Sequence, residues 1–160
     1  MANIFDNYSN LGFYNALHPS VAGQVVPGTG GITIDLQGAT AAAIIVQVGS
    51  THFLAASELH LALQHGLASA AGVSAWSLVG NSQLIHSVFG GYNSTASDGI
   101  FHSLAAGSDS GIYACGYKFD NLHRYLRLYI SGDGGLGSMI AAAQAIVERT
   151  DWPVNEPVNA

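Results

Sequence analysis

The chain has 160 residues, of which 49% are hydrophobic and only 9% are charged, and its net charge is −6. Ordinary globular domains carry roughly 25% charged residues, so we expect much of this surface to be covered by other protein. Only four side chains are lysine or arginine, too few for the phosphate contacts of a nucleic-acid-binding protein, and we expect no nucleic-acid partner.

The N-terminal sequence has neither the basic region nor the apolar run that is typical of a signal peptide. No apolar stretch approaches the ~18–20 residues of a membrane-spanning helix, so we expect no membrane partner. The single cysteine, Cys115, lies in the apolar run "IYACGY" and has no second cysteine to pair with. We expect it to be a small buried side chain rather than a catalytic thiol.

Residues 1–31 are rich in Asn, Ser, Gly and Pro and are predicted to form an extended N-terminal arm. The arm carries aromatic and aliphatic side chains that need a surface to pack against, and we expect them to contact neighbouring protein. These residues are Phe5, Leu11, Phe13, Tyr14 and Leu17.

From residue 32 the pattern is typical of short strands. "ITIDL" (32–36) alternates, and "AAAIIVQVG" (41–49) is apolar enough for a strand that is buried on both faces. "ELHLALQHG" (58–66) places its three leucines on one face. Residues 66–75 are small and glycine-containing and are predicted to be a loop or a weak helix before "AWSLV" (75–79).

Further strands are predicted within residues 83–89, 99–105, 111–119 and 124–130. The last should place Tyr125, Arg127 and Tyr129 on one side of a sheet. Two Ala-rich stretches, 55–71 and 139–149, remain open between strand and helix. Together the segments predict a mainly β protein: an antiparallel β-sandwich or barrel at 32–150, followed by a C-terminal tail at 151–160.

The segment "SGDGGLGS" (131–138) contains G-x-G-x-x-G after a predicted strand, as in a dinucleotide-binding turn. Only 23 residues follow Gly137, too few for the rest of a nucleotide-binding unit, and the residues after the loop alternate in the manner of a strand. We therefore interpret the glycines as the loop of a β-hairpin and expect no cofactor.

Seven histidines raise the possibility of a metal site, but their local spacing does not support one. His60 and His65 lie five positions apart, which directs them to opposite faces of a strand. The run "GSDSG" (107–111) does not match a nucleophile elbow. We expect no catalytic residue and no bound metal, and hence a protein that is not an enzyme.

Several segments together resemble a family of small virion proteins encoded among the head genes of tailed bacteriophages. The resemblance runs from about residue 6 to residue 155 and rests on the order of its motifs. In the arm it includes Asn10, Leu11, Ala16, Leu17 and Pro19; at the first strand it includes Asp35, Leu36 and Gly38; in the late strand it includes Arg124, Tyr125 and Arg127. The acidic turn of the family pattern is replaced here by "GLASAAG" (66–72).

The resemblance implies a capsid decoration, or cement, protein on the outer surface of the virion capsid, assembled in the host cytoplasm. Such a protein would bind the major capsid protein and would be a homo-oligomer, with a trimer favoured by analogy. We expect Arg124 and Arg127 to form ion pairs with a partner and Trp152 of the tail to be a further contact. Two alternatives stay open: a phage tail or host-adhesion module that binds a receptor or glycan, and a metal- or nucleotide-dependent enzyme.

Overall fold

The computed structural model describes residues 11–17, 30–52, 58–69, 72–86, 99–105, 110–133 and 138–149. Within these ranges the regular structure consists of β-strands and one 3-10 helix, Asn81–Gln83. The strands are β1 (Leu11–Leu17), β2 (Ile34–Asp35), β3 (Ala39–His52), β4 (Glu58–Ser69), β5 (Gly72–Leu78), β6 (Leu84–His86), β7 (Ile100–Ala105), β8 (Gly111–Lys118), β9 (Tyr125–Asp133) and β10 (Ser138–Arg149).

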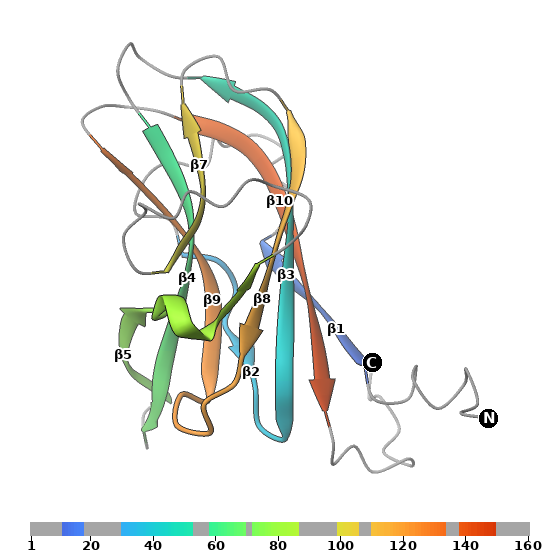
Figure 1. Cartoon of the computed structure of the whole chain (residues 1–160), viewed down its shortest axis with the longest axis vertical. Helices are drawn as coiled ribbons and strands as arrows, with labels where there is room; N and C mark the ends of the chain where they lie inside the picture. The colour runs from blue at the N-terminus through green and yellow to red at the C-terminus, as the bar shows by residue number, and fades with distance from the viewer. Residues whose placement is uncertain are drawn as a thin grey trace, which may run out of the picture.

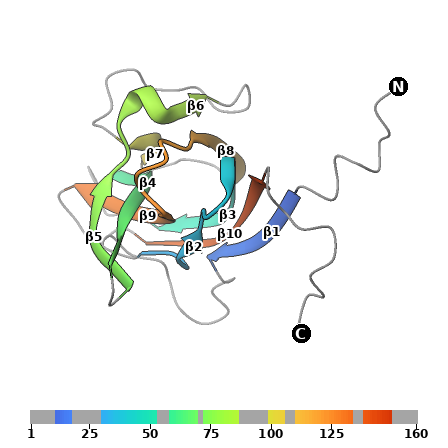
Figure 2. The same cartoon turned by 90° about the horizontal axis from the view of Figure 1, so that it is seen from below.

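The strands form two antiparallel sheets on either side of one core, with β1 and β5 on opposite sides of the molecule (Figures 1 and 2). The first sheet has the order β1-β10-β3-β8-β6. The second has the order β2-β9-β4-β5, and β7 also pairs with β4. The predicted mainly β class is confirmed. The arrangement is compatible with a sandwich, and the sheets do not close into a barrel.

Alternating side chains from both sheets fill the space between them. From the second sheet the predicted leucine face of β4 is fully buried, together with Leu126 and Leu128 of β9. From the first sheet Ile44 and Val46 of β3 and Tyr117 of β8 have no exposed surface. The core is continuous across the two layers, as expected for a single domain of this size.

The Ala-rich stretch that the sequence left open at 139–149 forms strand β10. It pairs with β3 along its whole length, from Ser138 opposite His52 to Arg149 opposite Ala39. Its small inward side chains let the two sheets approach closely, and they are Ala141, Ala143, Ala145 and Val147. A strand forms here despite the helix propensity of alanine, because β1 and β3 satisfy the backbone groups of β10 on both sides.

Three expectations are corrected. The predicted loop or weak helix at 66–75 instead contributes the end of β4 and the start of β5, which pair with each other. Residues 11–17 of the predicted arm form β1, an edge strand that pairs with β10.

The third correction concerns "SGDGGLGS". The strands around it do not form a hairpin, because β9 belongs to one sheet and β10 to the other. The segment therefore connects the two layers, and β10 takes the place of the helix that a nucleotide-binding turn requires.

We expect Leu128→Ala to lower the free energy of unfolding by about 2–5 kcal/mol, because Leu128 is fully buried between the sheets. Urea unfolding at neutral pH measures the change. Leu122→Ala is the matched control, since Leu122 is 66% exposed, and it should change stability by less than about 0.5 kcal/mol. Equal losses in both variants would contradict this description of the core.

Candidate interaction surface

The outer side of the first sheet is lined mainly with apolar and small residues, and Asn15, Gln47 and Gln144 are polar residues among them. Residues 41–49 were expected to be buried on both faces, and the structure confirms this for one face only. Ala42, Ile44, Val46 and Val48 face the core, whereas the residues between them face outward. No described segment covers them. We call this surface the outer apolar face, and its members are Leu11, Phe13, Ala41, Ala43, Ile45, Ile85, Ile112, Ala114, Gly116, Ile140, Ala142 and Ile146.

The outer apolar face contains large side chains that are unusually open to solvent. Phe13 is 64% exposed, Ile112 is 62% exposed, and Ile85 and Ile140 are each 50% exposed. They come from four different strands, so the exposure is a property of the whole sheet face. Contiguous apolar surface of this kind is typical of a site that binds another protein.

Two open hollows lie on this face where the residues are small. The first has a volume of about 290 Å³ and the second of about 200 Å³. The first is lined by Leu11, Ala41, Ala42, Ala43, Ile85, Gly116, Ile146 and Glu148. The second is lined by Ile45, Gln47, Ile112, Ala142, Ala143 and Gln144. The face thus offers both protruding and recessed apolar surface.

Gly116 forms part of the floor of the first hollow because β6 approaches β8 closely at this point. A Cβ atom at position 116 would lie 2.8 Å from the Cβ of Ile85, too close for any larger residue without movement of β6. The glycine therefore keeps the hollow open and lets β6 pair with β8.

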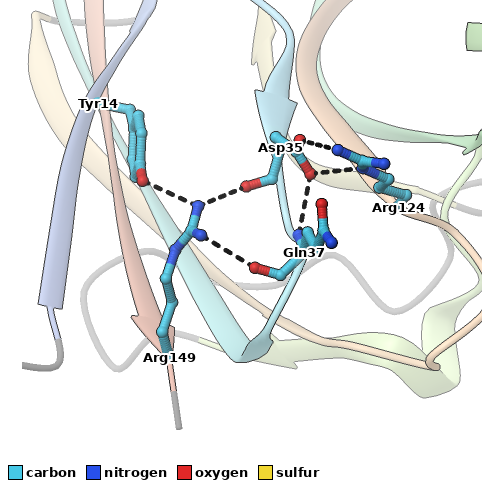
Figure 3. A network of polar contacts seen from close by, with 5 residues as sticks. All are labelled: Tyr14, Asp35, Gln37, Arg124 and Arg149. Atoms are coloured by element: carbon cyan, nitrogen blue, oxygen red, sulfur yellow. Dashed lines mark hydrogen bonds and ion pairs between the residues drawn. The ribbon is translucent and has the colours of Figure 1, made fainter. Parts of the chain in front are cut away.

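A polar network joins the two sheets at the edge beside β1 (Figure 3). The guanidinium of Arg149, at the end of β10, donates to the Tyr14 hydroxyl and to the main-chain oxygens of Asp35 and Gln37, each at 2.9 Å. The carboxylate of Asp35 accepts two hydrogen bonds from Arg124, at 2.9 and 2.6 Å. Hydrogen bonds from Arg124 hold the pKa of Asp35 below its usual value, although partial burial opposes this.

This network gives roles to two of the residues expected to bind a partner. Arg124 is paired within its own chain, with Asp35. Tyr14 faces Arg149 and packs against the core, as Leu17 does. Leu11 and Phe13, by contrast, lie on the outer apolar face. Phe5 and Trp152 lie outside the described residues.

Arg127 lies on the outer side of the second sheet, among half-exposed aromatic rings. Its guanidinium is 4.2 Å from the centroid of the Trp76 ring and 5.9 Å from that of Tyr129. Two of its nitrogens donate to the side-chain oxygen of Gln64, at 2.9 and 2.7 Å. The predicted sidedness of β9 is confirmed, because Leu126 and Leu128 face the core while Tyr125, Arg127 and Tyr129 are half-buried.

A cluster of His65, Asp120 and His123 forms where β4 meets the β8–β9 turn, and the sequence pattern did not predict it. Nδ1 of His123 lies 2.6 Å from Oδ2 of Asp120, and the rings of His65 and His123 stack with centroids 3.5 Å apart. Burial opposes ionisation of Asp120, yet hydrogen bonds from His123, Leu122 and Gln83 hold its pKa well below the usual value. Only the pairing of β4 with β9 brings residues 65 and 123 together, so their spacing in the sequence carries no signal.

Each of the three side chains has a nitrogen or oxygen atom that could bind a metal ion, and these atoms lie close to one another. The two imidazole rings are stacked and nearly parallel, at 11°. The lone pair of a ring nitrogen lies in the plane of its ring, so the lone pairs of the two rings lie in separate parallel planes and do not converge on one ion. Asp120 already accepts hydrogen bonds from Gln83, from the His123 ring and from two main-chain N–H groups. The geometry favours a hydrogen-bonded cluster that fixes the turn.

Cys115 is buried on β8, and burial raises the pKa of its thiol to about 12. Its Sγ lies 3.3 Å from the Gly116 oxygen. The thiol is un-ionised at neutral pH and is a packing group.

Comparison with known proteins adds no family: no protein-family model matches the chain, and no curated protein matches it significantly. The resemblance to phage virion proteins therefore remains a prediction. In the part of the chain that the structure describes, no helix has the length and apolar character needed to cross a membrane.

We expect Arg149→Lys to lower the free energy of unfolding by about 1–3 kcal/mol, because a lysine cannot reproduce the fork that binds Tyr14, Asp35 and Gln37 together. Chemical denaturation monitored by circular dichroism measures the loss. Lys118→Arg, at an exposed cation on β8 of the same sheet, is the control and should leave stability unchanged. A neutral Arg149→Lys would show that the network does not hold the sheets together.

Stability should depend on pH through His65. Burial and the neighbouring His123 lower the pKa of His65, so the unfolded chain binds a proton more readily than the folded one. The contribution of His65 to the free energy of unfolding is therefore greatest above about pH 6.5, the pKa of a histidine in the unfolded chain, and it decreases as the pH falls below that value. Urea unfolding between about pH 7.5 and 5.5 should show a shallower decline for His65→Gln than for the wild type.

The pKa of His102 is also lowered by burial, so some decline should persist in His65→Gln and weaken further when His102→Gln is added. Parallel stability curves for the wild type and the single variant would contradict the assignment to His65.

Proposed function

We propose that the protein is a non-enzymatic virion structural protein, a capsid decoration protein that binds the major capsid protein of a tailed phage and stabilises its head. The observation that carries the proposal is the outer apolar face, with four large side chains at least half exposed on one sheet. A surface of this kind is costly in water and is explained when the protein works in contact with other protein.

The charge of the chain supports the same role. A net charge of −6 with few basic residues suits the outer surface of a capsid better than the inner surface, where packaged DNA would repel it. The sequence resemblance supports a position among the head proteins, and the outer surface of the capsid is the location we propose.

The buried chemistry in the described residues supports a structural role as well. Cys115 is un-ionised, and the His65–Asp120–His123 cluster is satisfied by its own hydrogen bonds. Neither group lines the two hollows of the outer apolar face.

The alternative is a tail or host-adhesion module that binds a receptor or glycan. It is favoured by the half-exposed rings of Trp76 and Tyr129 around Arg127 on the second sheet, because aromatic rings beside polar groups are suited to binding amphipathic ligands. Under this alternative, Trp76→Ala would abolish binding to host cells, and labelled protein would be found on the tail.

The proposal is tested with heads assembled without this protein. Added protein should co-sediment with them at a fixed ratio and raise the temperature at which they rupture, and electron microscopy should find it on the capsid shell. Phe13→Ser should lower the occupancy, because Phe13 is 64% exposed on the outer apolar face and the change weakens any contact made there, with the capsid or between copies of the chain. Leu122→Ser, at a residue 66% exposed elsewhere, should retain full occupancy.

Failure of the wild-type protein to bind heads, or its location on the tail, would overturn the proposal. Deletion of the first twenty residues is a poorer test, because it removes β1 from the sheet.

A further inference from the structure

We propose that the outer apolar face binds a second copy of the same chain, about a two-fold axis that runs along β3. The inference rests on the same face as the proposed function and names a second copy as its occupant, so the unit offered to the capsid is a dimer, in place of the trimer that the resemblance implies. It does not require a capsid, since it concerns the protein in solution.

The strand order makes the outer apolar face symmetric about β3. β10 lies on one side of β3 and β8 on the other, with β1 and β6 beyond them (Figure 2). A two-fold axis parallel to β3 packs the outer apolar faces of two copies against each other. The strands of the two sheets are then aligned, which is a common way for sheets to pack. It places β3 on β3 and β10 on β8 of the second copy, at equal heights along the strands.

The charges on the face match under this operation. Glu148 of β10 and Lys118 of β8 both lie opposite Ala41 of β3, so they occupy one row on either side of the axis. Both side chains are exposed. The two-fold axis brings each Glu148 opposite the Lys118 of the other copy, so one interface contains two pairs of opposite charge.

The shapes match in the same way. Ile146 and Gly116 share a row through Ala43, so Ile146 of one copy meets Gly116 of the other, at the floor of the first hollow. In another row Ala142 and Ile112 lie on either side of Gln47. The axis therefore brings Ile112 of one copy onto Ala142 of the other, in the second hollow. In both rows a large side chain faces a small one.

Two glutamines lie at the centre of the face. Gln47 lies on β3 itself, so the axis brings the two Gln47 amides together, and each amide has both a donor and an acceptor to offer the other. Gln144 of β10 lies in the row of Ile45 and Ala114, next to the row of Gln47, so the axis sets it diagonally to Gln47 of the other copy.

The opposite orientation, with the axis across the strands, is less favourable. It would pack one end of the face against the opposite end of the face in the other copy. Glu148 and Lys118 would then contact apolar residues near Ala142 and Ile112 of that copy. Each charge would then be buried without a partner, which is strongly unfavourable. The charges therefore select the axis along β3.

Charge reversal tests the arrangement in the full-length protein. Sedimentation equilibrium should give the wild type twice the 16.5 kDa mass of one chain. Lys118→Glu alone places two negative charges at each pair, and Glu148→Lys alone places two positive charges there. Each variant should weaken self-association by about a hundredfold or more, because like charges would face each other in a desolvated contact.

The decisive sample is an equimolar mixture of the two variants. One chain is then negative at both positions and the other is positive at both, so they should form a heterodimer although neither associates alone. The double variant Lys118→Glu/Glu148→Lys should recover the homodimer. Glu58→Lys, an exposed charge reversal on the other sheet, is the control and should remain dimeric. Circular dichroism establishes that each variant is folded.

A monomeric or trimeric wild type would overturn the inference, as would folded single variants that stay dimeric, or a mixture that stays monomeric. The proposed capsid role fails differently: a dimer with these properties that does not bind heads would leave this inference intact and remove that function.

Discussion

The antiparallel pairing of β10 with β3 is the constraint on which the rest of the structure depends. It joins the last described strand to the centre of the first sheet over the full length of both strands. Because side chains alternate along a strand, this register decides at once which residues of both strands enter the core and which face outward. A slip by one residue would exchange the buried Ile44 and Val46 for Ala43 and Ile45.

The same pairing makes the outer side of the sheet unusual. In most half-exposed sheets the solvent side is polar, whereas here the outward residues of β3 and β10 are largely alanine and isoleucine. Such a face is stable in an assembly, where another protein replaces water. The scarcity of charge in the chain and the apolar outer face are therefore two aspects of one property.

The polar residues act mainly within the chain. Arg149 and Asp35 hold β1 and β10 to the second sheet (Figure 3). Asp120 with His123 fixes the turn between β8 and β9. Arg124 is used in the same way, by its pairing with Asp35. With these charges satisfied internally, Lys118 and Glu148 are the two charged side chains in the described residues that border the outer apolar face, and they lie at one end of it.

Local pattern determined the fold class and the position of most strands, because alternation of period two is visible wherever one face of a strand is buried, as in 58–66 and 124–130. It also indicated that Phe13 and Leu11 need a protein surface. It was wrong at 66–75 and undecided at 139–149, because alanine and glycine suit several backbone conformations and only pairing with neighbours selects one. Tertiary structure alone decided that residues 41–49 are covered on one face, that residues 65 and 123 meet, and that Glu148 and Lys118 share a row. These depend on which strands lie side by side, and that information is distributed over contacts between residues far apart in the chain.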